Sequence, residues 1–385
     1  MPHTTPDNTL NASPRLLKRL FSRKVALDET LLDEQTLDNL APGDVLLAVR
    51  RLALTTNNIT YAAFGDAMQY WQFFPTGRPD WGAMPVWGFA DVVESTLEGV
   101  EVGERFYGYF PIANLLRVQP GRVTDRGFYD EAPHRRELTS AYNQYTRCSA
   151  DAAYRADAEN LQILLRPLFI TSFMLADFLQ DNAFFGARQL VISSASSKTA
   201  YGTAFCLQQP ALTGAADSAA VERIGLTSGR NLAFVERLGC YGRAVDYDGL
   251  SKLDASLPTL YVDFSGDEAL RERVHRHFGT SLVYDCYAGS AQNPSFLRET
   301  NLPGPAPLLF FAPVQIAKRN KDWGYGLFNQ RFTAAQQAFY ARVSDLHDPW
   351  LSVREHHGLA TTPALVDALY HGRLDPQEGQ VVVPD

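Results

Sequence analysis

Four polar residues between a predicted strand and a predicted helix have the chemistry of a phosphate site. The strand is expected over Leu190–Ser193 and the helix over Thr199–Gln208. A helix N-terminus attracts anions through its backbone N–H groups, and hydroxyl and ammonium side chains there add donors and positive charge. The residues that supply these groups are Ser196, Ser197, Lys198 and Thr199. We interpret the segment as a variant phosphate cradle; the alternative is a capped helix beside a solvated lysine that binds nothing.

The usual glycines of a dinucleotide-binding turn are replaced here by serine and alanine. Residues 194–200 read Ser-Ala-Ser-Ser-Lys-Thr-Ala. These side chains are small, so the backbone can still approach a pyrophosphate closely. A Walker A loop ending in Ser197-Lys198-Thr199 is disfavoured, because both P-loop glycines are missing.

The end of the next predicted strand carries a second set of candidate binding residues. An NAD site places an aspartate or glutamate there, which accepts a hydrogen bond from the ribose 2′-hydroxyl. This chain has Thr227, Ser228 and Arg230 instead, in the segment Gly225-Leu-Thr-Ser-Gly-Arg. Two hydroxyls and a guanidinium suit a 2′-phosphate, so NADP(H) is favoured over NAD(H). The alternative for Arg230 is an ordinary solvated arginine.

Candidate proton donors lie in an aromatic region of the N-terminal half. Where a nicotinamide cofactor serves as the hydride donor, the protein orients the substrate and supplies a proton. Tyr70 and Tyr61 are the candidate donors, and Asn58 is a candidate to orient the substrate or the nicotinamide ribose. The chain has 17 tyrosines, so packing is the alternative role for both, and a turn asparagine is the alternative for Asn58. The aromatic residues near 70–74 and 81–89 indicate a large apolar pocket, a lid or a domain core.

The elements that must position these residues change in character along the chain. The N-terminal part predicts short strands after glycine turns, at 45–53, 88–94 and 102–110, and then a polar excursion and linker over 120–160 with one strand near 142–148. A helix is expected over 161–179. Strands and helices then alternate, which is typical of βαβ units in a doubly wound parallel sheet. The helical segments 334–343 and 363–370 and a strand over 379–383 end the chain.

Length and charge exclude several classes of protein. The chain has 385 residues, 45% of them hydrophobic, which predicts two domains. Its net charge is −8, so a nucleic-acid backbone is a poor candidate ligand. We expect no contact with a membrane, because no uninterrupted apolar run reaches about 20 residues.

The cysteines and the N-terminus favour a reducing compartment. Cys148, Cys206, Cys240 and Cys286 form no CxxC pair and have no histidine at metal-ligand spacing. We expect buried thiols and neither disulfides nor a zinc site. Residues 1–13 are polar and lack the apolar core of a signal peptide, so they are interpreted as a frayed start. A cytoplasmic location follows from these observations.

Several segments, taken in order, resemble the medium-chain dehydrogenase/reductase superfamily. The matching segments are Ala41–Val49, Asn57-Asn58 before Gly65, Met84–Val93, Gly103–Gly108, Leu168–Phe173 and Gly379–Val383. The resemblance implies an α/β fold with a β-rich GroES-like domain (1–160 with 315–385) and a Rossmann-like domain (161–314). It also implies that Thr171 lies near the nicotinamide. Ser193–Ala200 looks like a divergent branch known only as a domain of unknown function.

The resemblance also indicates which chemistry to expect. Zinc-dependent members have a cysteine where this chain has residues 55–58 and a His-Glu pair where it has Trp87-Gly88-Phe89, so no metal is expected. The zinc-free quinone oxidoreductases and enoyl reductases transfer a hydride from NADPH to an activated double bond. Tyr70 resembles the tyrosine of enoyl-thioester reductases, with a different spacing. The implied partners are a small apolar substrate and a second copy of the chain.

Two other functions and two basic segments stay open. A catalytically silent nucleotide-binding or scaffold protein is one alternative, because the glycine turn is altered, and a carbonyl reductase is another. The basic residues 318–321 are expected either to meet cofactor phosphates or to form a solvated turn. His275 and His277 have arginines around them and predict a solvated basic helix face.

Overall fold

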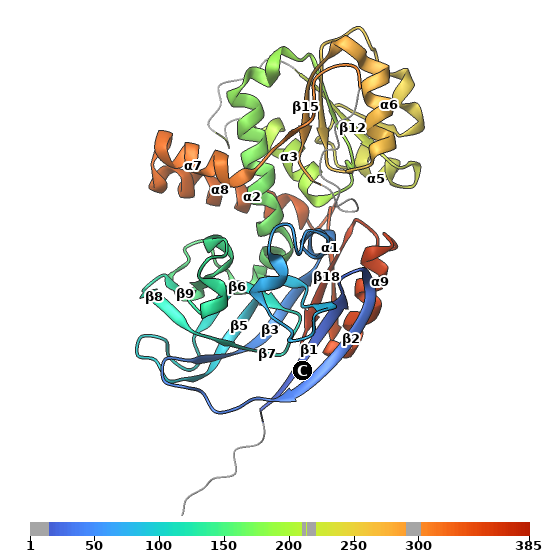
Figure 1. Cartoon of the computed structure of the whole chain (residues 1–385). Helices are drawn as coiled ribbons and strands as arrows, with labels where there is room; N and C mark the ends of the chain where they lie inside the picture. Colours follow the sequence, from blue (N-terminus) through green and yellow to red (C-terminus); the bar gives the residue numbers. More distant parts are fainter. Residues whose placement is uncertain (1–14, 210–212, 214–220, 290–301) are drawn as a thin grey trace, which may run out of the picture.

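The computed structural model describes residues 15–209, 213, 221–289 and 302–385. The predicted frayed start, residues 1–13, lies outside these ranges. Figure 1 shows a β-rich part that carries the N-terminal and C-terminal strands, and an α/β part built around the middle of the chain. The long helix α2 (Glu159–Asp181) connects the two parts.

The β-rich part is dominated by a nine-stranded sheet, and the C-terminal strands return to it. Its order is β17-β18-β3-β5-β6-β10-β9-β8, and β7 pairs with β3. Its strands are β3 (Val45–Leu54), β5 (Pro85–Ser95), β6 (Arg105–Pro111), β7 (Leu115–Val118), β8 (Pro120–Thr124), β9 (Gly127–Asp130), β10 (Gln144–Arg147), β17 (Ser352–His357) and β18 (Glu378–Val383). The predicted linker over 120–160 is therefore wrong in part: β10 lies in the strand predicted near 142–148, but β8 and β9, which were not predicted, also extend the sheet. Both are only a few residues long and contain Pro120, Gly121 or Gly127, so no strand pattern stands out in the sequence.

Two long strands before residue 40 form a second, three-stranded sheet that the sequence did not reveal. Its order is β2-β1-β4, with β1 (Leu16–Arg23), β2 (Ala26–Thr36) and β4 (Trp81–Gly82). The helix α1 (Thr56–Ala63) follows β3, and the one-turn helix η1 (Tyr70–Phe73) precedes β4. These two short helices carry the candidate proton donors.

The six-stranded sheet confirms the doubly wound α/β fold. Its order is β13-β12-β11-β14-β15-β16, and each neighbouring pair is parallel. The strands are β11 (Gln189–Ile192), β12 (Glu222–Thr227), β13 (Arg243–Asp246), β14 (Thr259–Asp263), β15 (Leu282–Tyr287) and β16 (Leu308–Leu309). The helices α3 (Lys198–Gln208), α5 (Leu232–Arg237) and α6 (Glu268–Phe278) alternate with them. The strand order runs in opposite directions on either side of β11, between β12 and β14. Ligands bind at such a switch point in open α/β sheets.

Helix α2 is the core element shared by both parts. In the described part of the chain, the segment Ala156–Asp181 is the one helix long and apolar enough to cross a membrane, with a mean hydropathy of 1.4. Of that apolar window, 61% is buried, as is typical of a core helix. Phe169 stacks on Phe339 with ring centroids 4.5 Å apart. A Cβ on Gly379 of β18 would lie 2.5 Å from Leu164, so the returning strand fits closely against α2.

The last helices fill the space beside α2. They are α7 (Ala312–Trp323), α8 (Tyr325–Val343) and α9 (Thr362–Tyr370). The basic residues 318–321 lie inside α7 and not in a turn, so that expectation is corrected. Arg319 is 8% exposed, and its Nε donates to Asp177 of α2 at 2.7 Å. Arg319 and Lys318 pair with Asp177 and Asp181 of α2, which attaches α7 to α2, whereas Lys321 is exposed.

The expectation of a solvated basic face on α6 is also corrected. His275 is 1% exposed, and its ring nitrogens lie 2.8 Å from Asp285 Oδ2 and 2.8 Å from the Pro303 carbonyl. Arg271 is buried beside it and donates to Asp263 at 2.6 Å. Arg271 and His275 thus meet buried carboxylates of β14 and β15, whereas Arg273 and Arg276 are exposed, so the basic face is solvated only in part. The four cysteines are free and buried, as expected.

Candidate functional site

A cavity of about 780 Å³ is lined by residues from both parts of the fold. Its lining includes the N-terminal end of α3, the first turns of α1, the middle of α2 and the start of α7. Aromatic and aliphatic side chains form much of the wall, including Phe64, Met68, Phe264, Phe310, Ile316 and Phe332. The cavity therefore joins a large apolar space to a helix N-terminus, a combination typical of cofactor-dependent sites.

The turn after β11 presents the start of α3 to this cavity. Ser196, Ser197, Lys198 and Thr199 all belong to its lining. Ser194 has a φ of +48°, a left-handed conformation that turns the chain sharply into the helix. Ser197 caps the helix, since its Oγ accepts from the Ala200 N–H at 3.3 Å. The Asn231 side chain donates to the Ser196 Oγ at 3.1 Å, which links this turn to the end of β12.

Helix α3 is held unusually close to α2 just below this turn. A Cβ on Gly202 would lie 2.7 Å from the Ser172 Oγ, so a larger residue would force the helices apart. The Ser172 hydroxyl also donates to the Thr199 carbonyl at 2.8 Å. Thr171 is the neighbour of Ser172 on α2 and lines the cavity. The glycine that permits close packing therefore lies at position 202, inside the helix.

Lys198 is bonded to the returning chain. Its Nζ donates to the backbone carbonyls of Pro376 at 3.1 Å and Glu378 at 3.0 Å. Burial lowers its pKa to about 8, and the nearby carboxylates of Asp375 and Glu378 oppose that shift. An ammonium has three N–H donors. Two are used in the described part of the chain, so one remains for a ligand.

The residues at the end of β12 take different positions. Thr227 is 1% exposed, and its carbonyl accepts from the Tyr247 N–H at 2.8 Å. Ser228 lies at the start of the one-turn helix η7 (Gly229–Asn231). Arg230 lines the cavity, and its Nη2 donates to the Gly372 carbonyl at 3.0 Å. Arg230 is therefore the member of this set that faces the cavity.

Both predicted proton donors lie in a group of aromatic rings on the cavity wall. The hydroxyls of Tyr70 and Tyr142 are 3.2 Å apart, and Trp87 Nε1 donates to the Tyr61 hydroxyl at 3.3 Å. The rings of Tyr61 and Tyr70 are 4.8 Å apart. Tyr142 was not predicted as a site residue, because its contact with Tyr70 depends on the fold and not on sequence spacing. We call Tyr61, Tyr70 and Tyr142 the phenol cluster.

Burial keeps the phenol cluster protonated. It raises the pKa of Tyr61 to about 12, with a further rise from Tyr70. Burial also raises the pKa of Tyr70, and it raises that of Tyr142 well above its ordinary value. A phenol of this kind keeps its proton at neutral pH, so it suits the role of a donor and not of a base.

Asn58 serves the structure of α1. Its side chain is 2% exposed, and its Oδ1 accepts from the Thr55 N–H at 2.6 Å. Its Nδ2 donates to the Pro85 carbonyl at 2.9 Å. These bonds form part of a capping box at the start of the helix. The neighbouring Asn57 lines the cavity instead.

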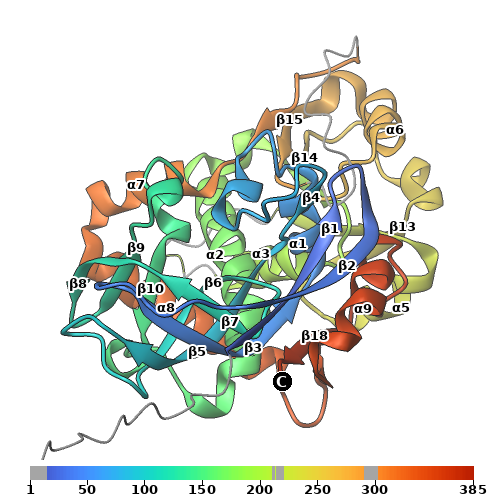
Figure 2. The ribbon, with the colours of Figure 1, turned by 60° about the horizontal axis from the view of Figure 1, so that its bottom comes forward.

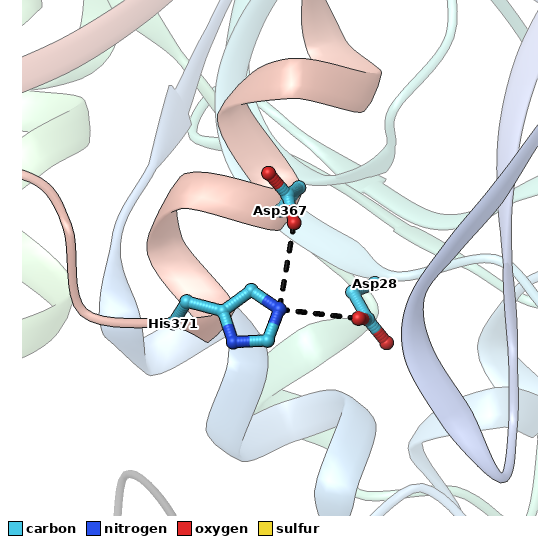
Figure 3. Close-up of side chains that lie close together, drawn as sticks. All are labelled: Asp28, Asp367 and His371. Carbon is cyan, nitrogen blue, oxygen red and sulfur yellow. Dashed lines mark hydrogen bonds and ion pairs between the residues drawn. The ribbon is translucent and has the colours of Figure 1, made fainter.

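One group of side chains in the described residues has the composition of a metal site, and it lies at the surface. His371 of α9 faces Asp28 of β2 at 3.2 Å and Asp367 of α9 at 3.5 Å, through the same ring nitrogen (Figure 3). Asp367 also pairs with Arg373. Asp367 thus already faces a guanidinium, and both carboxylates share the same imidazole nitrogen. Thr55 and Trp87 stand where the zinc-dependent members of the superfamily are expected to have metal ligands. Both line the cavity, and neither supplies a thiolate, imidazole or carboxylate.

A family model described as "Protein of unknown function (DUF2855)" matches residues 52–375. The chain belongs to this family. No curated protein sequence matches it. DUF2855 membership agrees with the predicted divergent branch and carries no activity of its own.

Solved structures establish the overall fold of this DUF2855 protein. CurA of Vibrio vulnificus, in complex with NADPH, is 13% identical with a TM-score of 0.59, covering 96% of this chain and 99% of that one. A putative NADPH:quinone reductase from Bacillus thuringiensis is 11% identical, with a TM-score of 0.55 and the same coverage. The Etr1p complex with NADP and crotonyl-CoA is 11% identical, with a TM-score of 0.51 and the same coverage. The fold is that of the medium-chain reductases, with GroES-like and Rossmann domains.

Proposed function

We propose that this DUF2855 protein binds NADP(H) and reduces an activated double bond of an apolar enone, quinone or enoyl thioester without zinc. The observation that carries this proposal is the single cavity that joins the N-terminus of α3 to the phenol cluster. The first end has the donors that a pyrophosphate needs, and the second has protonated groups beside an apolar wall. Two of the solved structures named above are complexes, one with NADPH and one with NADP and crotonyl-CoA, which supports the same assignment.

The described residues fit a dinucleotide along one side of the cavity. Ser196, Ser197 and Thr199 offer hydroxyls to a pyrophosphate, the first turn of α3 offers backbone N–H groups, and Lys198 offers its remaining N–H. Thr171 of α2 would border the nicotinamide, and Arg230 with Thr227 and Ser228 would border the adenosine ribose. The cofactor supplies the hydride when bound. The protein orients the substrate against it, excludes water and supplies the proton.

A catalytically silent binding protein is the alternative that a specific observation favours. Both predicted phosphate-binding cations, Lys198 and Arg230, already bind backbone carbonyls of the returning chain. This use of both cations suits a scaffold protein that keeps the reductase fold, because the cations then hold its two parts together. A carbonyl reductase is a further alternative, because the same cavity and phenols would serve a carbonyl substrate. The domain bounds at 160/161 and 314/315, a homodimer and a cytoplasmic location stay predictions.

Titration with NADPH and NADH, followed by protein fluorescence, tests the proposed cofactor. We expect saturable binding of NADPH and weaker binding of NADH, because Arg230 faces the cavity and no carboxylate stands at positions 227–230. NADPH oxidation is then measured with an enone, a quinone, an enoyl-CoA and an aldehyde. If the protein bound neither NADPH nor NADH, the proposal that it is an NADPH-dependent enzyme would be wrong. Binding without turnover on any of the four substrates would favour the silent protein, and turnover of the aldehyde alone would favour the carbonyl reductase.

The affinity for NADPH is expected to fall as the pH rises through about 8. The lowered pKa of Lys198 means that its ammonium loses its proton there, and with it the positive charge that would attract a pyrophosphate. In the K198R variant the guanidinium stays charged, so the decline should disappear. The measurement is the Kd of NADPH between pH 6.5 and 9.5. An identical decline in both proteins would show that Lys198 does not contact the phosphates.

A further inference from the structure

A second groove, of about 540 Å³, continues from the cavity along the surface. Arg230, Asn231 and the segment Leu374–Pro376 line both spaces. One wall is formed by η7 and α5. The other wall is the segment between α9 and β18, which runs beside α5 in both views (Figure 1, Figure 2). A ligand that leaves the cavity at Arg230 therefore enters a groove made by both parts of the chain.

The lining of this groove is rich in guanidinium groups. Arg230 and Arg237 lie on one wall and Arg373 on the other, against a single lining carboxylate, Asp375. The Asp375 carboxylate also interacts electrostatically with Lys198, and the positive charge of Lys198 partly offsets the negative charge of Asp375. The groove therefore has an excess of positive charge, although the chain as a whole has a net charge of −8. We call it the arginine groove.

The present partners of these arginines leave them available to a ligand. Arg230 donates to a neutral carbonyl, that of Gly372. Arg237 lies 3.5 Å from Asp348 and contacts the Gln377 side chain. Arg373 pairs with Asp367 with about half of its side chain exposed. Exposed ion pairs of this kind are weak, so a guanidinium can turn toward a stronger anion at little cost.

The chemistry of the groove selects a phosphate monoester. Guanidinium groups bind phosphate oxygens in a bidentate geometry, and a phosphate monoester offers two negative charges and three non-bridging oxygens. The groove begins at the end of β12, where a dinucleotide in this fold places its adenosine ribose. We propose that the arginine groove holds the 2′-phosphate of NADPH, with Arg237 and the returning chain's Arg373 as its added ligands. This inference rests on the proposed function, and it assigns selection of NADPH over NADH to both parts of the chain.

Adenosine 2′,5′-bisphosphate and ADP are the probes that separate this site from the rest of the cofactor site. Calorimetric titration of the wild-type protein should show tighter binding of the bisphosphate. The R237Q and R373Q variants should each lose roughly tenfold or more in affinity for the bisphosphate, because a hydrogen bond to a charged group is lost. Their affinity for ADP should change less than twofold. Equal losses for both probes, or no loss, would overturn the assignment.

The D367N variant distinguishes a ligand role of Arg373 from a structural one. This variant removes the carboxylate that pairs with Arg373 and leaves the guanidinium in place. We expect it to bind the bisphosphate at least as tightly as the wild type, whereas R373Q binds it weakly. If D367N lost affinity as R373Q does, the ion pair would matter and not the arginine. Thermal melting of each variant verifies that it is folded.

The two proposals fail in different ways. If the wild-type protein bound neither ADP nor the bisphosphate and neither NADPH nor NADH, the proposed function would be wrong and this inference would fall with it. If NADPH bound but R237Q and R373Q kept the wild-type preference for it over NADH, the arginine groove alone would be wrong. Potassium chloride should weaken bisphosphate binding more than ADP binding, because the exposed arginines are screened by salt.

Discussion

The Y70F variant is expected to reduce its substrate about 10²–10⁴-fold more slowly than the wild type while binding NADPH equally well. The change removes one hydroxyl from the cavity wall and leaves the ring that packs against Tyr61. A hydride added to a double bond leaves an electron-rich centre that must take up a proton. In the variant that proton has to come from water, which the apolar wall excludes. The measurement is kcat under saturating NADPH, with the fluorescence Kd as the binding control.

The other two phenols make the test specific. Y142F removes the partner of the Tyr70 hydroxyl, 3.2 Å away, so it should lower kcat less than Y70F does. Y129F is a matched control on β9, where the ring packs under Arg122 at 3.9 Å, and it should leave kcat unchanged. A large loss in Y61F with full activity in Y70F would move the donor role to Tyr61. No loss in either would mean that neither phenol donates the proton.

The pH profile adds an independent check on the donor. The raised pKa values of the phenol cluster mean that these groups stay protonated through the neutral range and beyond it. A donor of this kind predicts that kcat does not decline between pH 7 and 9 through loss of the phenol proton. Because Lys198 acts on binding, its titration should appear in kcat/KM for NADPH and not in kcat. The two groups can therefore be separated in one set of measurements.

The sequence predicted the α/β architecture because its signals are local. The strands β11 and β14 are short, largely apolar runs, and the helices that follow them, α3 and α6, begin at the polar capping residues Ser197 and Asp267. Such patterns can be recognised in the sequence without knowledge of any long-range contact. The strand β10 was predicted, whereas β1, β2, β8 and β9 were missed. In β1 and β2 charged residues pair across the strands, for example Arg19 with Asp33, and such pairs cannot be recognised before the register is known.

The site was predicted in part for the same reason. The position of Ser196–Thr199 at a strand-to-helix turn can be read from a short window, and the structure places these residues at the cavity. The role of Lys198 in holding the returning chain depends on Pro376 and Glu378, about 180 residues further along the sequence. Tyr142 reaches Tyr70 across 72 residues. Contacts over these separations follow from the fold and not from spacing.

Replacing Arg135 with methionine is expected to lower the free energy of unfolding by about 3–5 kcal/mol. Arg135 is 1% exposed, and its Nη1 donates to Asp130 at 2.6 Å. It also donates to the side chain of Asn143 at 3.0 Å and to the carbonyl of Tyr142 at 2.9 Å. Without the guanidinium, the Asp130 carboxylate is left charged and buried. Guanidinium chloride unfolding followed by circular dichroism measures the loss.

Two comparisons identify the buried charge as the cause. The R135M/D130N double variant removes the uncompensated carboxylate and should recover part of the lost stability. R122M breaks an exposed pair with Glu131 and should cost less than about 1 kcal/mol. If R135M were no less stable than R122M, the buried pair of Arg135 and Asp130 would not contribute the expected stability. Because Arg135 binds the carbonyl of Tyr142, R135M should also lower kcat by displacing the partner of Tyr70, and the double variant should not restore it.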